Sequence, residues 1–333
     1  MKTKIVYCLV SDPNDYYYEQ LLISLCSLRK HNPDVKVEVF CDTETYATLR
    51  DHRSGIYDYN IDVIPVQIPQ EYDVINKVIK SRYIKTNLRK LTRGDFLFVD
   101  TDTIICSSLT FVDDFTFDVA AVKHAHIGRA IPEKDKAIYG SEIWILKEAE
   151  KIGANIHNLW HFNSGVMYVK DVKKSYELYS KWSEHYFNQL KLNVFIDQLS
   201  LLLSNHEMGE IITPLDYRLN CQVCFDSARN KVSGASIIHY IPRHKKTILS
   251  SPWLMDPIKD SGKINPSIQR IIDNPYDFFY VLSEVVKGEK ADLLNTPGLC
   301  EAHSACPNVF KLWLNGLKLY LAIKKWLYRV VHF

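Results

Sequence analysis

The sequence predicts an α/β protein with a mostly parallel central β-sheet. Short apolar runs alternate along the chain with stretches whose apolar residues recur at helical spacing, and most of the runs end in turn residues. One run, residues 96–99, is apolar at every position, as expected for a strand that is buried on both faces. Together these observations favour a layered fold in which helices cover a parallel sheet.

The elements are expected in strand–helix order. The first strand, 5–9, ends at Ser11, Asp12 and Pro13, and a helix with regularly spaced leucines follows it. Residues 127–158 show weak periodicity, so we expect them to leave the sheet. The expected strands are 5–9, 35–40, 61–66, 96–99, 119–122, 166–169 and 237–238, and the expected helices are 19–30, 44–50, 74–91, 172–187 and 197–203.

Composition sets the broad class of the protein. No linker-like stretch precedes residue 250, which predicts one large domain over 1–250 and a helical C-terminal extension over 251–333. The net charge of +2, from 41 basic and 39 acidic residues, argues against nucleic acid as the main partner. The eight cysteines are too sparse for a disulfide framework. Because we find no signal-peptide pattern and no apolar run long enough to span a bilayer, we expect a cytoplasmic protein.

Two carboxylates follow the most apolar strand. Residues 96–99 lead directly into Asp100, Thr101 and Asp102, and because side chains alternate along an extended chain, both acids point to one side. The carboxyl ends of parallel strands border the ligand crevice, so two acids there are placed to hold a divalent cation that neutralises a diphosphate. Asp is also common where strands end in turns, so the interpretation depends on other residues.

A histidine and a lysine give the first support. His239 ends the apolar strand 237–238, and Lys245 lies in the cationic loop that follows it. Imidazole is a ligand for manganese-like metals, and a lysine is a point charge that suits phosphate. The alternative is a structural histidine.

Two further segments carry small or polar residues. Asn163, Ser164 and Gly165 precede the strand 166–169, where they either let a ligand approach the backbone or form a tight turn. Asp197 and Gln198 begin a helix, where they either reach a ligand or only stabilise the helix N-terminus.

These motifs resemble those of the GT-A type glycosyltransferases of family 8, which includes glycogenin and bacterial lipopolysaccharide galactosyl- and glucosyltransferases. The resemblance runs from residue 4 to about 246, and it implies a Rossmann-like nucleotide-sugar-binding catalytic domain over 1–250. The motifs that carry it are Ser11-Asp12 with Asp15 and Tyr16, Tyr83-Ile84-Lys85, Phe98-Val99-Asp100-Thr101-Asp102, Asn163-Ser164-Gly165, Asp197-Gln198, and His239 with Lys245.

The resemblance implies a role for each motif. Asp100, Asp102 and His239 would bind Mn²⁺ or Mg²⁺, and Lys245 would contact the diphosphate. Asp197 and Gln198 would lie at the reacting face of the donor sugar. The family usually has Arg at the position of Lys85, so either Lys85 or its neighbour Arg82 reaches the phosphate. The other implied donor-binding residues are Ser11 and Asp12 near the uracil, then Tyr16, Asp100, Thr101, Asn163 and Ser164.

The implied function is retaining transfer of a hexose, of glucose or galactose type, from a UDP-sugar to a glycan hydroxyl in the synthesis of cell-surface polysaccharide or lipopolysaccharide. Because the departing diphosphate carries negative charge, a metal ion and a lysine would supply the main catalytic effect. Two alternatives stay open. One is a phosphohydrolase of the haloacid dehalogenase type, which also uses Asp-x-Asp after an apolar strand, and the other is a non-catalytic module that binds sugar nucleotides or glycans.

The end of the chain, 308–333, contains no acidic residue. Its basic residues lie mainly on one helical stripe beside a broad apolar face with Trp and Tyr, as is typical of a helix in a membrane interface. The alternative is a helix that packs on the domain with its basic stripe in water. The first interpretation predicts peripheral contact with the inner face of an anionic membrane and a lipid-linked glycan as acceptor.

Overall fold

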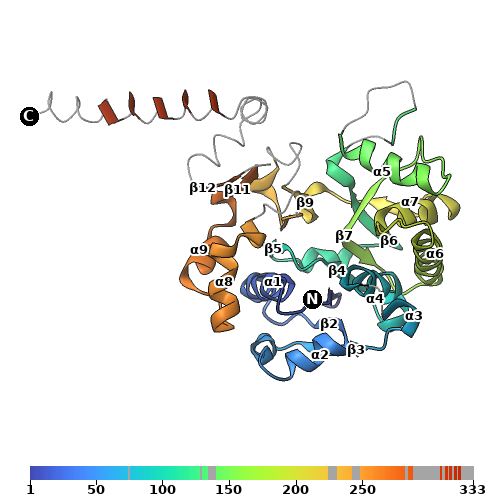
Figure 1. Ribbon diagram of the computed structural model, residues 1–333, viewed down its shortest axis with the longest axis horizontal. Helices are drawn as coiled ribbons and strands as arrows, with labels where there is room; N and C mark the ends of the chain where they lie inside the picture. Colours follow the sequence, from blue (N-terminus) through green and yellow to red (C-terminus); the bar gives the residue numbers. More distant parts are fainter. Residues whose placement is uncertain are drawn as a thin grey trace, which may run out of the picture.

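The computed structural model describes residues 1–73, 76–127, 130–133, 140–223, 231–241, 248–281 and 284–287, and helical residues at 308–309, 312–313, 315–316, 319–320 and 322–323. Within these ranges a seven-stranded sheet lies between two groups of helices (Figure 1). The predicted α/β class and mostly parallel sheet are confirmed.

The main sheet has the strand order β3-β2-β1-β4-β7-β6-β8. Strands β1 to β4 run parallel, whereas β7 is antiparallel to both of its neighbours, β4 and β6. The amino end of β7 therefore lies at the same edge of the sheet as the carboxyl end of β4. These strands are β1 (Lys4–Leu9), β2 (Val37–Asp42), β3 (Asp62–Val66), β4 (Phe96–Val99), β6 (Val119–Lys123), β7 (Phe162–Val169) and β8 (Ile212–Pro214).

Two smaller sheets complete the strands. In the first, β10 pairs with β5 in antiparallel fashion and with β9 in parallel, which sets His239 opposite Thr103. The second is a β-hairpin of β11 and β12. Their strands are β5 (Thr103–Ile105), β9 (Cys221–Gln222), β10 (Ile237–His239), β11 (Phe278–Val281) and β12 (Glu284–Lys287).

Helices cover both faces of the main sheet because its central strands carry apolar residues on both faces. Ile5 and Tyr7 pack in the cluster that contains α1, α8 and α9, whereas Val6 faces the cluster that contains α4, α6 and α7. The helices are α1 (Tyr17–His31), α2 (Thr43–Leu49), α3 (Gln70–Asp73), α4 (Lys77–Leu91), α5 (Gly140–Lys151), α6 (Lys173–Leu190), α7 (Asp197–Glu207), α8 (Pro252–Ser261) and α9 (Pro266–Asp273).

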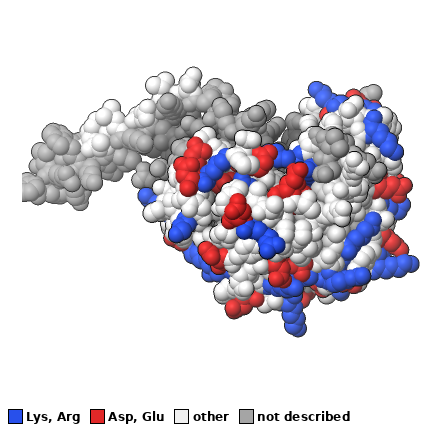
Figure 2. Space-filling view, turned by 60° about the horizontal axis from the view of Figure 1, so that its bottom comes forward, with Lys and Arg blue, Asp and Glu red and all other residues white. Residues whose placement is uncertain are grey.

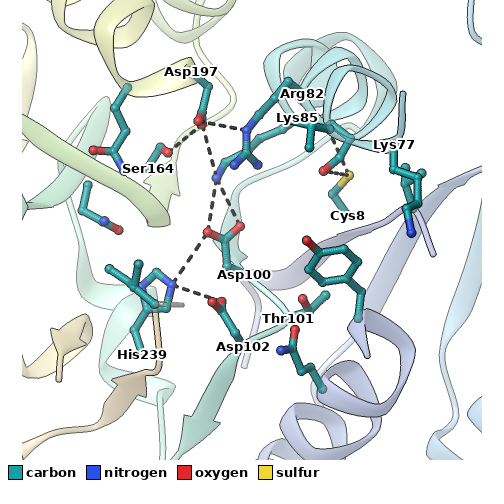
Figure 3. Close-up of a pocket in the computed structure, with 18 residues that line it drawn as sticks. Cys8, Lys77, Arg82, Lys85, Asp100, Thr101, Asp102, Ser164, Asp197 and His239 are labelled. Carbon is teal, nitrogen blue, oxygen red and sulfur yellow. Dashed lines mark hydrogen bonds and ion pairs between the residues drawn. The ribbon is translucent and has the colours of Figure 1, made fainter. Parts of the chain in front are cut away.

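Helix α4 brings cationic side chains to the sheet edge. It begins at Lys77 because Oδ1 of Asn76 accepts a hydrogen bond from the Ile79 N–H over 3.1 Å, a typical N-cap. The predicted start at Val74 lies outside the described residues. From this start, successive turns of α4 place Arg82 and Lys85 beside β4 (Figure 3).

The structure corrects two expectations and adds one helix. Asn163, Ser164 and Gly165 are residues of β7, which begins at Phe162, and do not form a turn ahead of it. The described residues of 127–158 contribute no strand to the main sheet, as expected, but they contain helix α5, which was not predicted. The C-terminal extension is not purely helical, since it contains β11 and β12, and its helices α8 and α9 share the hydrophobic core of α1.

The surface carries both signs of charge. On the face shown in Figure 2, Lys and Arg side chains lie among Asp and Glu side chains over the described part of the body. That mixture agrees with the small net charge of the chain.

Candidate active site

The turn after β4 is held by backbone hydrogen bonds on both sides. The N–H of Asp100 donates to the carbonyl oxygen of Gly165 over 2.7 Å, and the N–H of Tyr240 donates to the carbonyl oxygen of Asp102 over 2.8 Å. The Thr103 hydroxyl donates to the Asp100 carbonyl over 2.9 Å. The main sheet and the β5–β10 pair thus position the two carboxylates together.

His239 completes a cluster of three possible metal ligands. Its Nε2 lies 3.1 Å from Oδ1 of Asp102 and 3.9 Å from Oδ2 of Asp100. The three side chains can present ligand atoms that all lie within 4.8 Å of one another (Figure 3). The structure therefore brings together the three metal ligands that the sequence predicts.

The chemistry of this cluster fits a divalent cation. Two carboxylates and one imidazole form an oxygen-rich set that suits Mn²⁺ or Mg²⁺. The space is kept open by Gly165, because a methyl group there would overlap Cε1 of His239 and come within 2.7 Å of Oδ2 of Asp100. A bound ion would supply positive charge opposite the phosphates of a ligand.

Two cations of α4 meet a third carboxylate. Lys85 Nζ lies 3.1 Å from Asp100 and 3.5 Å from Asp197, and Arg82 Nε lies 2.9 Å from Asp197. The Ser164 hydroxyl donates to Asp197 over 2.8 Å. Burial raises the pKa of Asp197, but Arg82, Lys85 and the Ser164 hydrogen bond outweigh burial and lower it to about 2. Asp197 is therefore ionised at neutral pH, and Arg82 and Lys85 balance its negative charge.

The two carboxylates of this cluster have opposite pKa shifts. Burial raises the pKa of Asp100, and although Lys85 and His239 oppose it, the neighbouring Asp102 acts in the same direction as burial. Burial also acts to raise the pKa of Asp102, but His239 outweighs it and lowers this pKa. Two carboxylates this close repel each other, and a cation bound between them would relieve the repulsion.

These groups open into one pocket with a cavity volume of about 320 Å³. Figure 3 shows it between β4, α4 and the first turn of α7. The predicted residues that line it are Arg82, Lys85, Asp100, Thr101, Asp102, Asn163, Ser164, Asp197, Gln198 and His239. Lys245 lies outside the described residues.

Three predicted donor-binding residues do not line this pocket. The Ser11 hydroxyl donates to Asp15, and Asp12 pairs with Lys77 at 2.7 Å. The Tyr16 hydroxyl donates instead to Asp256 of α8, over 2.7 Å. Ser11, Asp12 and Tyr16 thus lie beside the pocket and shape its wall indirectly.

The pocket is also lined by residues that were not predicted, which include Tyr17 and Lys77. Residues 16–18 are all tyrosines, so the composition of that segment does not tell which of them faces the pocket. Lys77 bridges Asp12 and Asp15 at 2.7 and 2.6 Å, and thereby ties α4 to the loop after β1. The lining residues that sequence reasoning missed are Cys8, Val10, Tyr17, Gln20, Lys77, Val78, Ser81 and Ile241.

Gln198 has a buried partner. Nε2 of His161 lies 2.9 Å from Oε1 of Gln198, and the His161 ring stacks on His124 with centroids 4.3 Å apart. Burial lowers the pKa of His161 to about 4, although the bond to Gln198 opposes that shift. His161 is therefore neutral at pH 7 and holds the carboxamide at the pocket wall.

The fold and this site define a class. A mostly parallel sheet with Asp-x-Asp at the end of a central strand is the arrangement of the GT-A glycosyltransferase fold. Among solved structures, the chain is similar to the galactosyltransferase LgtC in complex with donor and acceptor sugar analogs, at 15% identity and a TM-score of 0.51, over 80% of this chain and 99% of that one. The expected resemblance is thus confirmed at the level of fold.

Two other solved structures match with lower TM-scores. Mouse xyloside xylosyltransferase 1 is 11% identical with a TM-score of 0.47, over 72% of this chain and 97% of that one. The glycosyltransferase GlyE of Streptococcus pneumoniae is 18% identical with a TM-score of 0.46, over 82% of this chain and 63% of that one. No protein-family model and no curated protein sequence matches the chain.

Proposed function

We propose that this protein is a retaining glycosyltransferase that moves a hexose, of glucose or galactose type, from a UDP-sugar to a glycan hydroxyl. The observation that carries the proposal is the cluster of Asp100, Asp102 and His239 beside Arg82 and Lys85 in a pocket of a GT-A fold. The phosphohydrolase alternative gains no support from this fold, and the non-catalytic alternative is tested by turnover.

The site suits the departure of a diphosphate. Mn²⁺ or Mg²⁺ held by Asp100, Asp102 and His239 would neutralise charge on the leaving group. Of the two α4 cations, Arg82 has 30% of its side chain exposed and Lys85 only 2%. We therefore assign the phosphate contact to Arg82, and to Lys85 the task of holding Asp100 and Asp197. Lys245 keeps its proposed contact with the diphosphate.

The reacting face of the sugar is assigned to Gln198. Asp197 already pairs with two cations and Ser164, so we expect it to orient the donor and not to attack it. The carboxamide of Gln198 lines the pocket and is a neutral group that can lie against a carbocation-like centre. Attack by the acceptor from the same face as the leaving group would retain the anomeric configuration.

The test is release of UDP from a panel of UDP-sugars, with UDP-glucose and UDP-galactose first, in Mn²⁺, Mg²⁺ or excess chelator. We expect activity only with a divalent metal and a loss of about a thousandfold in Asp102→Asn, because the metal supplies the main electrostatic stabilisation. Asp51→Asn is the matched control, since this exposed carboxylate lies outside the pocket. Full activity in chelator would refute the proposal.

For the C-terminal segment, defined as residues 308–333, we propose peripheral binding to an anionic membrane at the inner face. Its described residues are helical, and Val309, Leu312, Leu319, Tyr320 and Ile323 are exposed there. In Figure 1 these residues lie away from the body. Among the described residues, no helix is long and apolar enough to cross a bilayer. The Lys and Arg residues of the segment would add about 1 kcal/mol each near anionic lipid.

Membrane binding would bring the site to a lipid-linked glycan, as in lipopolysaccharide synthesis. Sedimentation with liposomes should show binding that grows with anionic lipid and falls with salt. A chain that ends at Cys306 should lose this binding yet still release UDP from its donor, which serves as the control for folding. Equal sedimentation of both chains would exclude the segment as the anchor.

A further inference from the structure

His239 has a second polar contact, on the side of its ring away from the carboxylates. Nδ1 lies 2.8 Å from Oδ1 of Asn220, and Nε2 faces Asp102. Asn220 is fully buried and directly precedes β9. No pattern in the sequence marks it as part of the site.

The backbone N–H of Gly165 fixes the orientation of the Asn163 side chain, which in turn fixes that of Asn220. The N–H of Gly165 donates to the side chain of Asn163 over 2.9 Å, and because a backbone N–H only donates, the atom that it meets is the Asn163 oxygen. The side chain of Asn220 approaches the same oxygen at 2.8 Å, so it does so with its nitrogen. The oxygen of Asn220 is therefore the atom that faces His239.

This orientation decides where His239 carries its proton. Since the Asn220 oxygen only accepts, Nδ1 of His239 is the donor, and a neutral ring then has its lone pair on Nε2. Nε2 is the atom near Asp102 and Asp100, where a metal ion would bind. The other tautomer would direct an N–H into that place and leave two acceptors facing each other at Asn220.

We propose that Asn163 and Asn220 are positioning residues that fix the tautomer of His239 for metal binding. The same hydrogen-bond chain reaches Asp100, a second proposed metal ligand, because the carbonyl oxygen of Gly165 accepts from the N–H of Asp100. β7 thus aligns ligands on both sides of the site. The inference rests on the metal site of the proposed function and is independent of the donor sugar.

The first test measures Mn²⁺ affinity without donor, from the electron paramagnetic resonance signal of free Mn²⁺. Asn220→Leu should weaken binding by about 10- to 100-fold, the usual effect of removing a partner behind a metal-bound histidine. Asn220→Asp should retain clearly more of the affinity than Asn220→Leu, because its carboxylate still accepts from Nδ1 although its second oxygen loses the hydrogen bond to the Asn163 oxygen. Asn205→Leu is the matched control: Asn205 is also fully buried, but it bonds Ile212 and Glu210 after the far end of α7.

The second test asks whether Asn163 acts through Asn220. Asn163→Leu should weaken Mn²⁺ binding in the wild-type background but add nothing to Asn220→Asp, because a carboxylate needs no orientation to accept. Circular dichroism identifies any variant that fails to fold. If Asn163→Leu alone does not fold, the comparison of Asn220→Asp with the double variant Asn163→Leu/Asn220→Asp is the test.

Unchanged affinity in folded Asn220→Leu, or equal losses in Asn220→Leu and Asn220→Asp, would overturn the proposal. A wild-type protein that binds Mn²⁺ but turns over no UDP-sugar would overturn the proposed function alone. A wild-type protein that binds no Mn²⁺ would overturn both.

Discussion

At Gly165 the backbone of β7 passes directly against the proposed metal ligands His239 and Asp100. A Cβ there would overlap His239 and crowd Asp100, and both neighbours are held by other hydrogen bonds. We expect Gly165→Ala to lower Mn²⁺ affinity at least tenfold, measured by calorimetric titration. Gly234→Ala is the control, because the nearest atoms to a Cβ at that position lie 3.9 Å away. Similar affinities in the two variants would contradict this account.

His161 predicts a dependence of stability on pH. Its folded pKa of about 4 lies below the ordinary value of 6.5, so between these pH values the unfolded chain binds a proton that the folded chain does not. The stability that His161 contributes is present above pH 6.5 and is lost as the pH falls towards 4. Between pH 7 and pH 5 the free energy of unfolding should therefore fall by about 2 kcal/mol from this residue.

The measurement is urea unfolding of the wild-type protein and of His161→Gln at both pH values. The variant cannot titrate at this position, so its loss of stability should be smaller by that amount. If the two proteins lose stability equally between pH 7 and pH 5, His161 does not have the lowered pKa.

Sequence reasoning located site residues when they follow a strand end. Asp100 and Asp102 were predicted because the apolar run 96–99 precedes them, and His239 because the apolar run 237–238 precedes it. The structure brings the three side chains together in one cluster. Asn220 gives no such signal, since its role depends on hydrogen bonds to residues far away in the chain. The choice between Tyr16 and Tyr17 depends on the exact first turn of α1, which a run of three tyrosines does not fix.

At the scale of elements, α8 and α9 belong to the core of the main domain. Leu254, Met255 and Ile258 of α8 are buried in the cluster that contains α1, and the Tyr16 hydroxyl donates to Asp256. A chain that ends at residue 250 would expose this apolar surface, and each such side chain contributes about 1.5–3 kcal/mol when buried.

We therefore expect the 1–250 fragment to unfold at a lower urea concentration than a chain that ends at residue 287. The longer chain keeps α8, α9 and the β11–β12 hairpin, so it should match the full-length protein. Equal midpoints for the two shortened chains would support the original boundary at residue 250.

The accuracy of the predicted elements depended on their length and apolar content. Strand β4 was predicted with its bounds, because four apolar residues stand between turn residues. The short strands β5, β8 and β9 were missed, since two or three residues give no measurable period. Helix α5 was missed because Ile143 and Trp144 place apolar residues on its exposed face and so obscure the helical period.

At the scale of the whole molecule, metal binding should stabilise the fold. The pocket gathers three carboxylates, and the Lys and Arg side chains that pair with Asp100 and Asp197 among the described residues are Lys85 and Arg82. Among the described contacts, Asp102 faces His239, and a bound metal ion would add positive charge beside this carboxylate. At Mn²⁺ concentrations a hundredfold above the dissociation constant, the free energy of unfolding should rise by about 2.7 kcal/mol. Thermal unfolding of Asp102→Asn should show no such gain.

The small sheet of β5, β10 and β9 has a consequence for the rates of unfolding and refolding. Its pairing of His239 with Thr103 brings the proposed metal ligands His239 and Asp102 together from distant parts of the sequence, and contacts of this kind form late, because loop closure must come first. An ion bound by Asp102 and His239 would therefore stabilise contacts that form only after the folding transition state. Mn²⁺ should then slow unfolding in stopped-flow experiments and leave the refolding rate nearly unchanged, since contacts absent from the transition state affect only the unfolding barrier.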